Sequence, residues 1–265
     1  MCIRDSVNTP KPGTLIGERL KADPLIRRVA VLEFDTLPSG LADDLAAAAP
    51  AVEWIDGTAL FAGLRRTIDD AERGLLKRAD ALAAAALREA ESGKASDAGT
   101  LAGLVEQHAR LAGAEEVYIA VAPDLDRDNR LNRTSRPTPL QERFAVRASI
   151  AYKGSWVRRT RTFAKDDSTA KADAWFDGVV RSVEAGKPLA AQLADRIKQL
   201  PGAVLDSWMA ESCTGSYPLS VVASSRTAGH AAPPTGQFLV LTVELTLDGA
   251  PWFGAAPLVV GQNDL

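Results

Sequence analysis

The sequence predicts an α+β fold, with helices packed on one face of a mainly antiparallel sheet. Two segments with apolar residues at helical spacing are followed by a buried strand, a hairpin, two more helices and a last pair of strands. That order is typical of proteins whose helices cover one face of an antiparallel sheet. A hydrophobic content of 46% and a charged content of 25% are ordinary for a globular protein.

The first 58 residues predict the end of a preceding domain. Residues 1–6, MCIRDS, back-translate to a string that resembles a transposase end sequence from sequencing libraries, so we interpret them as a cloning scar that includes Cys2. Residues 29–34 (VAVLEF) then predict a buried strand, followed by a short helix and a second strand. Because this stretch is too short for a domain, we expect a truncated remnant over residues 7–58 and the main domain over residues 59–265.

The first helices of the main domain are predicted over residues 67–93 and 96–113. The first begins with acidic residues after Thr67 and ends at Gly93. The second is expected to be capped by Ser96 and stopped by Gly113. Residues 115–123 then predict a buried strand.

The second half of the chain is predicted to hold two hairpins and two helices. The hairpins are expected to turn at residues 152–154 and 248–249, and the helices to cover residues 168–186 and 187–202. Residues 124–143 are polar and rich in arginine. Their length favours either a functional loop or an ordinary solvated one.

Charge and cysteine content narrow the function classes. A net charge of −3 gives no general attraction to nucleic acid or to an anionic membrane, and no apolar run is long enough to span a bilayer. We expect a cytoplasmic protein. Without Cys2, Cys213 stands alone, which excludes a disulfide framework. Its thiol is either a nucleophile or a buried structural group, and the absence of neighbouring His or Asp residues favours the second.

The order of elements and the wording of the first hairpin resemble the pita-bread peptidase family, which includes methionine aminopeptidase, aminopeptidase P, prolidase and creatinase. The family hairpin reads roughly D-x-G-x-x-Y-x-G-Y-x-S-D-x-T-R-T. Tyr152, Gly154 and the run Thr160-Arg161-Thr162 occupy matching positions in this chain. The resemblance covers residues 52–260 and implies the pita-bread fold.

The resemblance also implies where a dimetal centre would lie. Active members hold two metal ions with two Asp, one His and two Glu. In this chain these positions are Arg147, Arg158, Ser216, Glu244 and Ala255. Two close dications need several anionic oxygen donors, and only Glu244 remains. We therefore expect a metal-free relative with no cofactor.

The two arginines predict a pocket of reversed charge. We expect Arg147 and Arg158 to lie across from each other on one sheet face, with Arg159 and Arg161 on the opposite face. A bound carboxylate or phosphate would satisfy the two guanidinium groups. The alternative is that they extend into solvent or pair with nearby acids such as Glu244.

The predicted function is therefore binding without catalysis. The ligand-pocket candidates are Arg147, Arg158, Ser216 and Glu244, and the expected ligand is a peptide, a small carboxylate or a protein partner. One alternative is a metal-independent, creatinase-like C–N hydrolase that uses His230, although a surface histidine in an Ala/Pro/Gly loop is the simpler interpretation. A weaker alternative is an orthodox X-Pro aminopeptidase. The resemblance also implies that a homodimer is one option. We expect no nucleic-acid partner.

Overall fold

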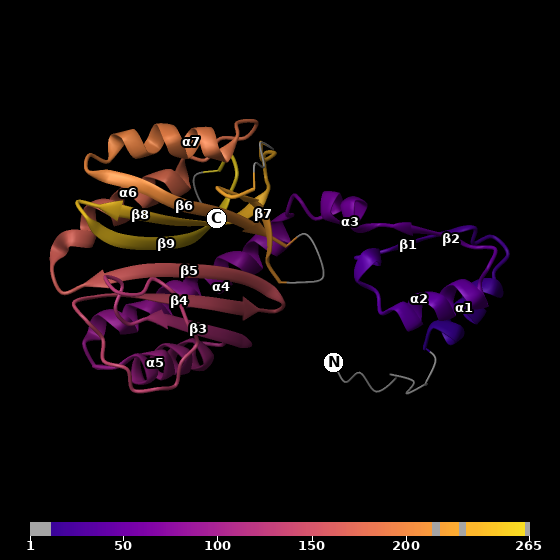
Figure 1. The fold of residues 1–265 in the computed structure, drawn as a ribbon, viewed down its shortest axis with the longest axis horizontal. Helices are drawn as coiled ribbons and strands as arrows, with labels where there is room; N and C mark the ends of the chain where they lie inside the picture. The colour runs from indigo at the N-terminus through magenta and orange to yellow at the C-terminus, as the bar shows by residue number, and fades with distance from the viewer. Residues whose placement is uncertain (1–11, 214–217, 228–231, 263–265) are drawn as a thin grey trace. The chain divides into compact units, whose positions relative to one another are not determined.

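The computed structural model describes residues 12–213, 218–227 and 232–262 (Figure 1). These residues divide into two compact units, one ending at Leu64 and the other beginning at Arg65. From the sequence we expected the main domain to begin at residue 59. In the structure the helix over residues 58–64 belongs with the first unit. The predicted scar, Ser216 and His230 lie outside the described residues.

The first unit is built on a two-stranded parallel sheet. Its elements are α1 (Pro12–Lys21), β1 (Arg28–Val31), η1 (Phe34–Thr36), α2 (Ser39–Ala48), β2 (Glu53–Asp56) and α3 (Thr58–Leu64). The first strand ends three residues earlier than predicted, because Glu33 adopts a left-handed backbone conformation with φ of 54°. Helix α1 was not predicted.

The second unit is built on a seven-stranded sheet in the order β3-β4-β5-β9-β8-β6-β7, and all its pairings are antiparallel. In Figure 1 the strands from β6 to β3 follow one another in this order. Their bounds are β3 (Glu116–Ala122), β4 (Arg143–Tyr152), β5 (Ser155–Ala164), β6 (Ala203–Ser212), β7 (Ser220–Ser224), β8 (Phe238–Leu247) and β9 (Ala250–Val259). This arrangement confirms the predicted α+β class with an antiparallel sheet.

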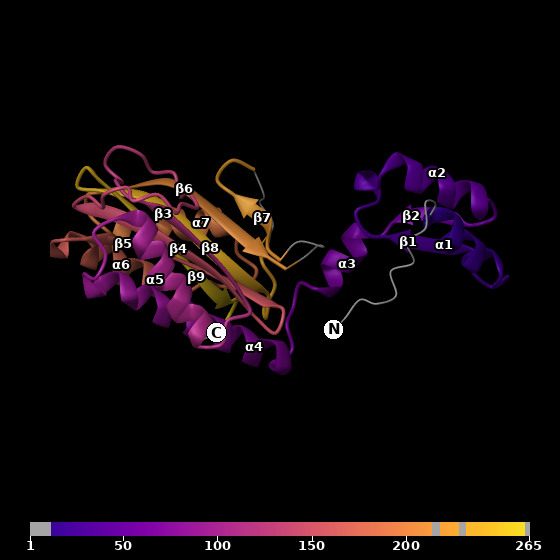
Figure 2. The same ribbon diagram turned by 90° about the horizontal axis from the view of Figure 1, so that it is seen from below.

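Among its described residues, the second unit also has four helices and three short 3-10 turns: α4 (Asp70–Arg88), η2 (Glu89–Ser92), α5 (Ala98–Leu111), η3 (Asp167–Thr169), α6 (Ala170–Arg181), α7 (Leu189–Arg196) and η4 (Ile197–Gln199). Helices α4 and α5 bury residues such as Leu76 and Leu101 against β3, β4 and β5. Helices α6 and α7 bury Phe176 and Leu193 against β6, β8 and β9. Figure 2 shows α4, α5 and α6 along one side of the sheet. No helix in the described part of the chain is long and apolar enough to cross a membrane.

The cap of α5 differs from the prediction. Asp97, not Ser96, is the N-cap, and its carboxylate accepts a hydrogen bond of 2.9 Å from the backbone N–H of Thr100. Asp69 caps α4 in the same way, accepting from the N–H of Glu72 at 2.8 Å. Both carboxylates satisfy a backbone donor that the first turn leaves free.

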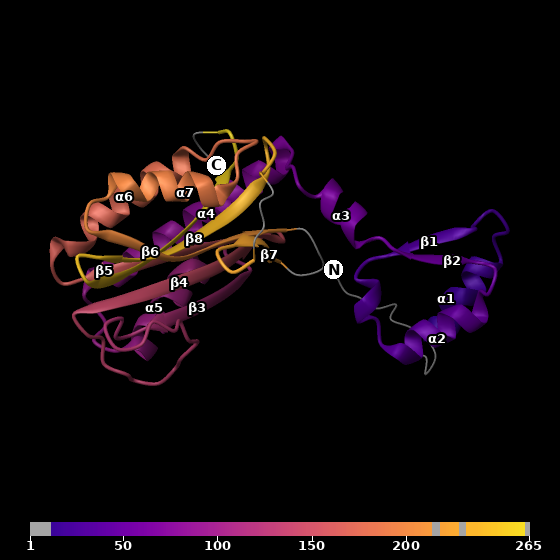
Figure 3. The same ribbon diagram turned by 45° about the horizontal axis from the view of Figure 1, so that its top comes forward.

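Two strands, β6 and β7, were not predicted from the sequence. The pairing of β6 with β8 shifts between Leu205 and Ser207, so a bulge interrupts the alternation of apolar and polar residues that marks a strand. Strand β7 is short and lies beside β6 at the edge of the sheet (Figure 3). These strands widen the sheet on the side of β8.

The register of β4 and β5 decides which side chains share a face. Arg147 lies opposite Thr160, and Arg158 lies opposite Ser149. The two arginines therefore share one face, as expected from the sequence. The expectation that they lie directly across from each other was wrong, because the register makes them diagonal neighbours. The face that carries them is turned away from the helices and is called the inner face below.

The opposite face carries the other two arginines, as predicted. Arg159 forms an ion pair with Asp80 of α4, and Arg161 forms one with Glu91 of η2. These pairs hold the first helix layer against the sheet, so neither arginine belongs to the inner face.

Candidate functional site

One row of residues crosses the centre of the inner face. Arg147 on β4 is paired with Thr160 on β5, Thr160 with Ala255 on β9, and Ala255 with Thr242 on β8. The row therefore begins with a guanidinium group and continues with a hydroxyl, a methyl and a second hydroxyl. We call these four residues the central row.

A buried ion pair lies beside the central row. The Nη1 of Arg158 donates to the Oε2 of Glu211 on β6, and its Nε donates to the Oγ of Ser149 at 3.2 Å. The side chain of Arg158 is 20% exposed and that of Glu211 is 6% exposed. Because β9 and β8 lie between β5 and β6, the two side chains bridge three strand spacings, about 14 Å of sheet.

The ion pair between Arg158 and Glu211 reduces the positive charge of the inner face. The acid that neutralises Arg158 is Glu211, and not Glu244, which was the nearby acid expected from the sequence. Arg147 is left as the remaining cation of the two. Within the described residues its side chain forms no hydrogen bond or ion pair. Burial, and then the charge of Arg158, lower the pKa of Arg147, and Glu211 raises it in part.

The two threonines of the central row carry unsatisfied hydroxyl groups. The Oγ1 atoms of Thr160 and Thr242 are buried, and neither has a hydrogen-bond partner in the part of the chain that the structure describes. A buried hydroxyl without a partner costs about 1–3 kcal/mol.

Glu244 also lies on the inner face, two residues beyond Thr242. It stands between Ser207 on β6 and Phe253 on β9 and is partly buried. No described residue forms a hydrogen bond or ion pair with its carboxylate. The structure thus brings Arg147, Arg158 and Glu244 onto one face. It does not bring Glu244 into contact with either arginine.

The donor set of this face does not fit two metal ions. The residues that the resemblance placed at the metal positions are arginines at 147 and 158 and an alanine at 255. No group of three or more His, Cys, Asp or Glu residues in the described chain could hold a metal ion. Two hard dications need more anionic oxygen donors than Glu211 and Glu244 supply, and Glu211 is already bound to Arg158.

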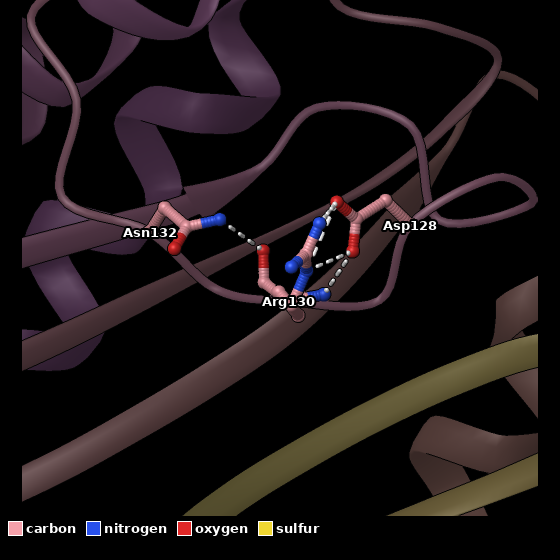
Figure 4. A network of polar contacts seen from close by, with 3 residues as sticks. All are labelled: Asp128, Arg130 and Asn132. Atoms are coloured by element: carbon pink, nitrogen blue, oxygen red, sulfur yellow. Dashed lines mark hydrogen bonds and ion pairs between the residues drawn. The ribbon is translucent and has the colours of Figure 1, made fainter.

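The arginine-rich loop between β3 and β4 borders the inner face. Leu125 packs with Ala145 and Phe253 on that face. In the loop, Asp128 holds the side chain of Arg130, and Asn132 donates to the carbonyl oxygen of Arg130 (Figure 4). The side-chain hydrogen bond from Arg130 lowers the pKa of Asp128 to about 2.

The loop lines an open hollow of about 800 Å³. Arg127 and Arg136 line it, together with Asp124 and Asp128. Arg133 instead stacks over the ring of Tyr118, with 4.7 Å between its guanidinium carbon and the ring centre. Acidic residues therefore offset the basic ones in this loop.

Cys213 has a partly buried thiol. Burial raises its pKa to about 11, and its Sγ donates to the carbonyl oxygen of Pro218. A thiol with so high a pKa is a poor nucleophile near neutral pH. The geometry therefore agrees with the structural role favoured from the sequence.

Sequence reasoning missed Glu211. Its only signal was an acidic residue in a segment, residues 203–212, whose strand pattern is interrupted by the bulge. Had β6 been predicted, Glu211 would have been placed on the face opposite Trp208 and Ala210, which pack under α6 and α7.

Comparisons with known proteins identify solved structures that have a similar fold. No family model and no curated protein matches this chain. Solved structures do match. The X-Pro aminopeptidase of Thermotoga maritima MSB8 has a TM-score of 0.73 at 12% identity, covering 97% of this chain and 77% of that one. The prolidase of Pyrococcus horikoshii OT3 has a TM-score of 0.72 at 14% identity, covering 94% and 76%.

A variant of aminopeptidase P from Escherichia coli gives a TM-score of 0.70 at 12% identity and covers 95% of this chain and 69% of that one. At these identities the similarity concerns the fold, because residues that carry function can differ while the backbone path is kept. The chain therefore has the pita-bread fold found in the X-Pro aminopeptidases and prolidases.

Proposed function

We propose that this protein is a metal-independent, non-catalytic relative of the pita-bread peptidases that binds a carboxylate on its inner face. The carboxylate would belong to a peptide, to another small molecule or to a protein partner. The observation that carries the proposal is Arg147, a partly buried guanidinium without a partner among the described residues. An anion beside it would restore the favourable interactions that burial and Arg158 remove.

The surroundings of Arg147 support a ligand with oxygen acceptors. Thr160 lies directly opposite Arg147, and Thr242 lies two strands further along the same row. Their unpartnered hydroxyl groups can donate to a carboxylate, as the fork of the guanidinium group does. Because Arg158 is neutralised by Glu211, the site favours one negative charge over two.

Binding of simple carboxylates tests this function. Titration calorimetry of the purified protein with an N-acetylated tripeptide that has a free carboxylate should give saturable binding. Arg147→Met should weaken it 10- to 100-fold, since a hydrogen bond to a charged group contributes about 1.5–3 kcal/mol. Arg110→Met, a change on an exposed helix position, should leave it unaltered.

Two results would overturn the proposal. If the wild-type protein shows no carboxylate binding at millimolar concentrations, the inner face is not such a site. If chelator-treated protein hydrolyses peptides or amidines, the protein is a metal-independent hydrolase instead, and His230→Ala would then test the alternative named above.

A further inference from the structure

The loop between β3 and β4 is held in place on both of its sides. On one side, the backbone groups of Val121 and Asn132 exchange two hydrogen bonds, of 2.9 and 3.1 Å. On the other side, the backbone N–H of Leu140 donates to the carbonyl oxygen of Ser96 at 2.9 Å. A loop of this length with a fixed path is typical of a functional loop.

The hollow lined by this loop has the size of a ligand pocket and a polar lining. Its volume of about 800 Å³ lies within the range of about 300–1,000 Å³ that small-molecule pockets span. Amide and hydroxyl side chains, among them Asn129, Thr138 and Gln141, line it beside the charged residues. None of the described residues that line it is aromatic, so the hollow offers no ring on which a nucleobase could stack.

Two arginines and one aspartate of the hollow have charges that no other side chain takes up. Asp128 is occupied by Arg130, whose Nη2 donates to its Oδ2 at 2.8 Å. Arg127, Arg136 and Asp124 line the same hollow, and their side chains form no hydrogen bond or ion pair within the described part of the chain. Two guanidinium groups favour a doubly charged anion, whereas the carboxylate repels a bare anion and accepts hydrogen bonds from hydroxyl groups.

We propose that this hollow binds a phosphomonoester whose other end carries hydroxyl groups, as a sugar phosphate does. Arg127 and Arg136 hold the phosphate, and Asp124 accepts hydrogen bonds from the hydroxyl groups. A phosphomonoester carries nearly two negative charges above pH 7, because its second pKa is about 6. None of the described residues that line the hollow belongs to the central row or to the pair of Arg158 and Glu211, so the phosphate site stands apart from the carboxylate site proposed above.

Titration calorimetry at pH 8 with three probes tests the class of ligand. Glucose 6-phosphate should bind saturably, and about tenfold or more tightly than inorganic phosphate, which has no sugar hydroxyl groups for Asp124. Glucose should not bind measurably, because it leaves both arginines without an anion. At pH 5, where the phosphate group has lost one negative charge, glucose 6-phosphate should bind several-fold more weakly.

Variants then assign each part of the ligand to its residue. Arg127→Met and Arg136→Met should each weaken binding of glucose 6-phosphate about tenfold or more, since each removes hydrogen bonds to a charged group. Asp124→Asn should narrow the difference between glucose 6-phosphate and inorganic phosphate, because it removes a charge that repels phosphate. Arg181→Met, at an exposed position on α6, is the matched control and should leave binding unchanged. The unfolding midpoint of each variant in urea shows whether it is folded.

Three results would overturn the inference. If glucose 6-phosphate does not bind at millimolar concentrations, the hollow is not a phosphate site. If Arg147→Met abolishes its binding while Arg127→Met and Arg136→Met do not, the phosphate lies on the inner face instead. If a phosphoserine tripeptide binds as tightly as glucose 6-phosphate, the sugar hydroxyl groups are not recognised and the ligand is a phosphopeptide.

Discussion

The buried pair between Arg158 and Glu211 yields the sharpest prediction. Glu211→Gln removes the negative charge and leaves the guanidinium of Arg158, 20% exposed, with Ser149 as its remaining polar partner and Arg147 as a like-charged neighbour. Breaking a buried pair from one side costs about 3–5 kcal/mol. Because Arg158 keeps some contact with water, we expect the lower end, about 3 kcal/mol.

Replacing both partners should give a different result. In Arg158→Met combined with Glu211→Leu, no charge stays unpaired, so the free energy of unfolding should lie within about 1 kcal/mol of the wild type or above it. A double-mutant cycle closed with the single variants Arg158→Met and Glu211→Leu should therefore give a coupling energy of about 5–6 kcal/mol, because each single variant loses about 3 kcal/mol and the double variant at most about 1 kcal/mol.

Urea denaturation followed by tryptophan fluorescence provides the assay. Trp54 lies in the first unit, so a Trp54→Phe background limits the signal to the four tryptophans of the second unit. With a slope of about 2 kcal/mol per molar urea, a loss of 3 kcal/mol lowers the midpoint by about 1.5 M. A single variant within 1 kcal/mol of wild type, or a double variant as unstable as the two singles added, would refute the reasoning.

Three further predictions concern metal content, the thiol and a helix cap. Metal analysis of purified protein should find no stoichiometric manganese, cobalt or zinc, and a chelator should leave the unfolding midpoint unchanged; two equivalents of metal would contradict the assigned donor set. Cys213 has a pKa raised to about 11, so its contribution to stability is complete below about pH 8.5 and is lost as the pH rises through 11. In a Cys2→Ser background, Cys213→Ala should remove that part of the pH profile, and an unchanged profile would show that the thiol is accessible to water. Asp69→Ala should lower the free energy of unfolding by about 1 kcal/mol through loss of the α4 cap, whereas a loss below 0.3 kcal/mol would mean that another group caps the helix.

The unpartnered threonines add a prediction in which stability and binding move in opposite directions. Thr160→Val and Thr242→Val remove buried hydroxyl groups that have no partner in the described structure, so each variant should be as stable as the wild type or more stable. The same changes should weaken carboxylate binding. Calorimetry and urea denaturation on the same samples check both effects, and a loss of stability would show that the hydroxyl groups are already satisfied.

Much of the second unit follows from local patterns. Helices α4, α5, α6 and α7 were predicted because their apolar residues recur at helical spacing, and the turns at residues 152–154 and 248–249 carry a glycine with positive φ. The sequence also indicated that Arg147 and Arg158 share a face, because side chains alternate along each strand.

Features that depend on distant contacts could not be predicted in this way. The bulge in β6 hides the strand, and with it Glu211. Whether Ser96 or Asp97 caps α5 depends on which side chain reaches the N–H of Thr100. The two-residue offset between Arg147 and Arg158 depends on the register of the hairpin.

The sequence by itself determined most of the helices and both hairpins of the second unit, since periodicity and residue type are properties of the chain alone. Only the tertiary structure decided how those charges are shared. Arg158 and Glu211 are 53 residues apart, and they meet because the strand order brings β5 and β6 within reach across the inner face. That pairing leaves Arg147 and Glu244 on the inner face without protein partners among the described residues, because charge pairing depends on distance in space rather than on separation along the chain.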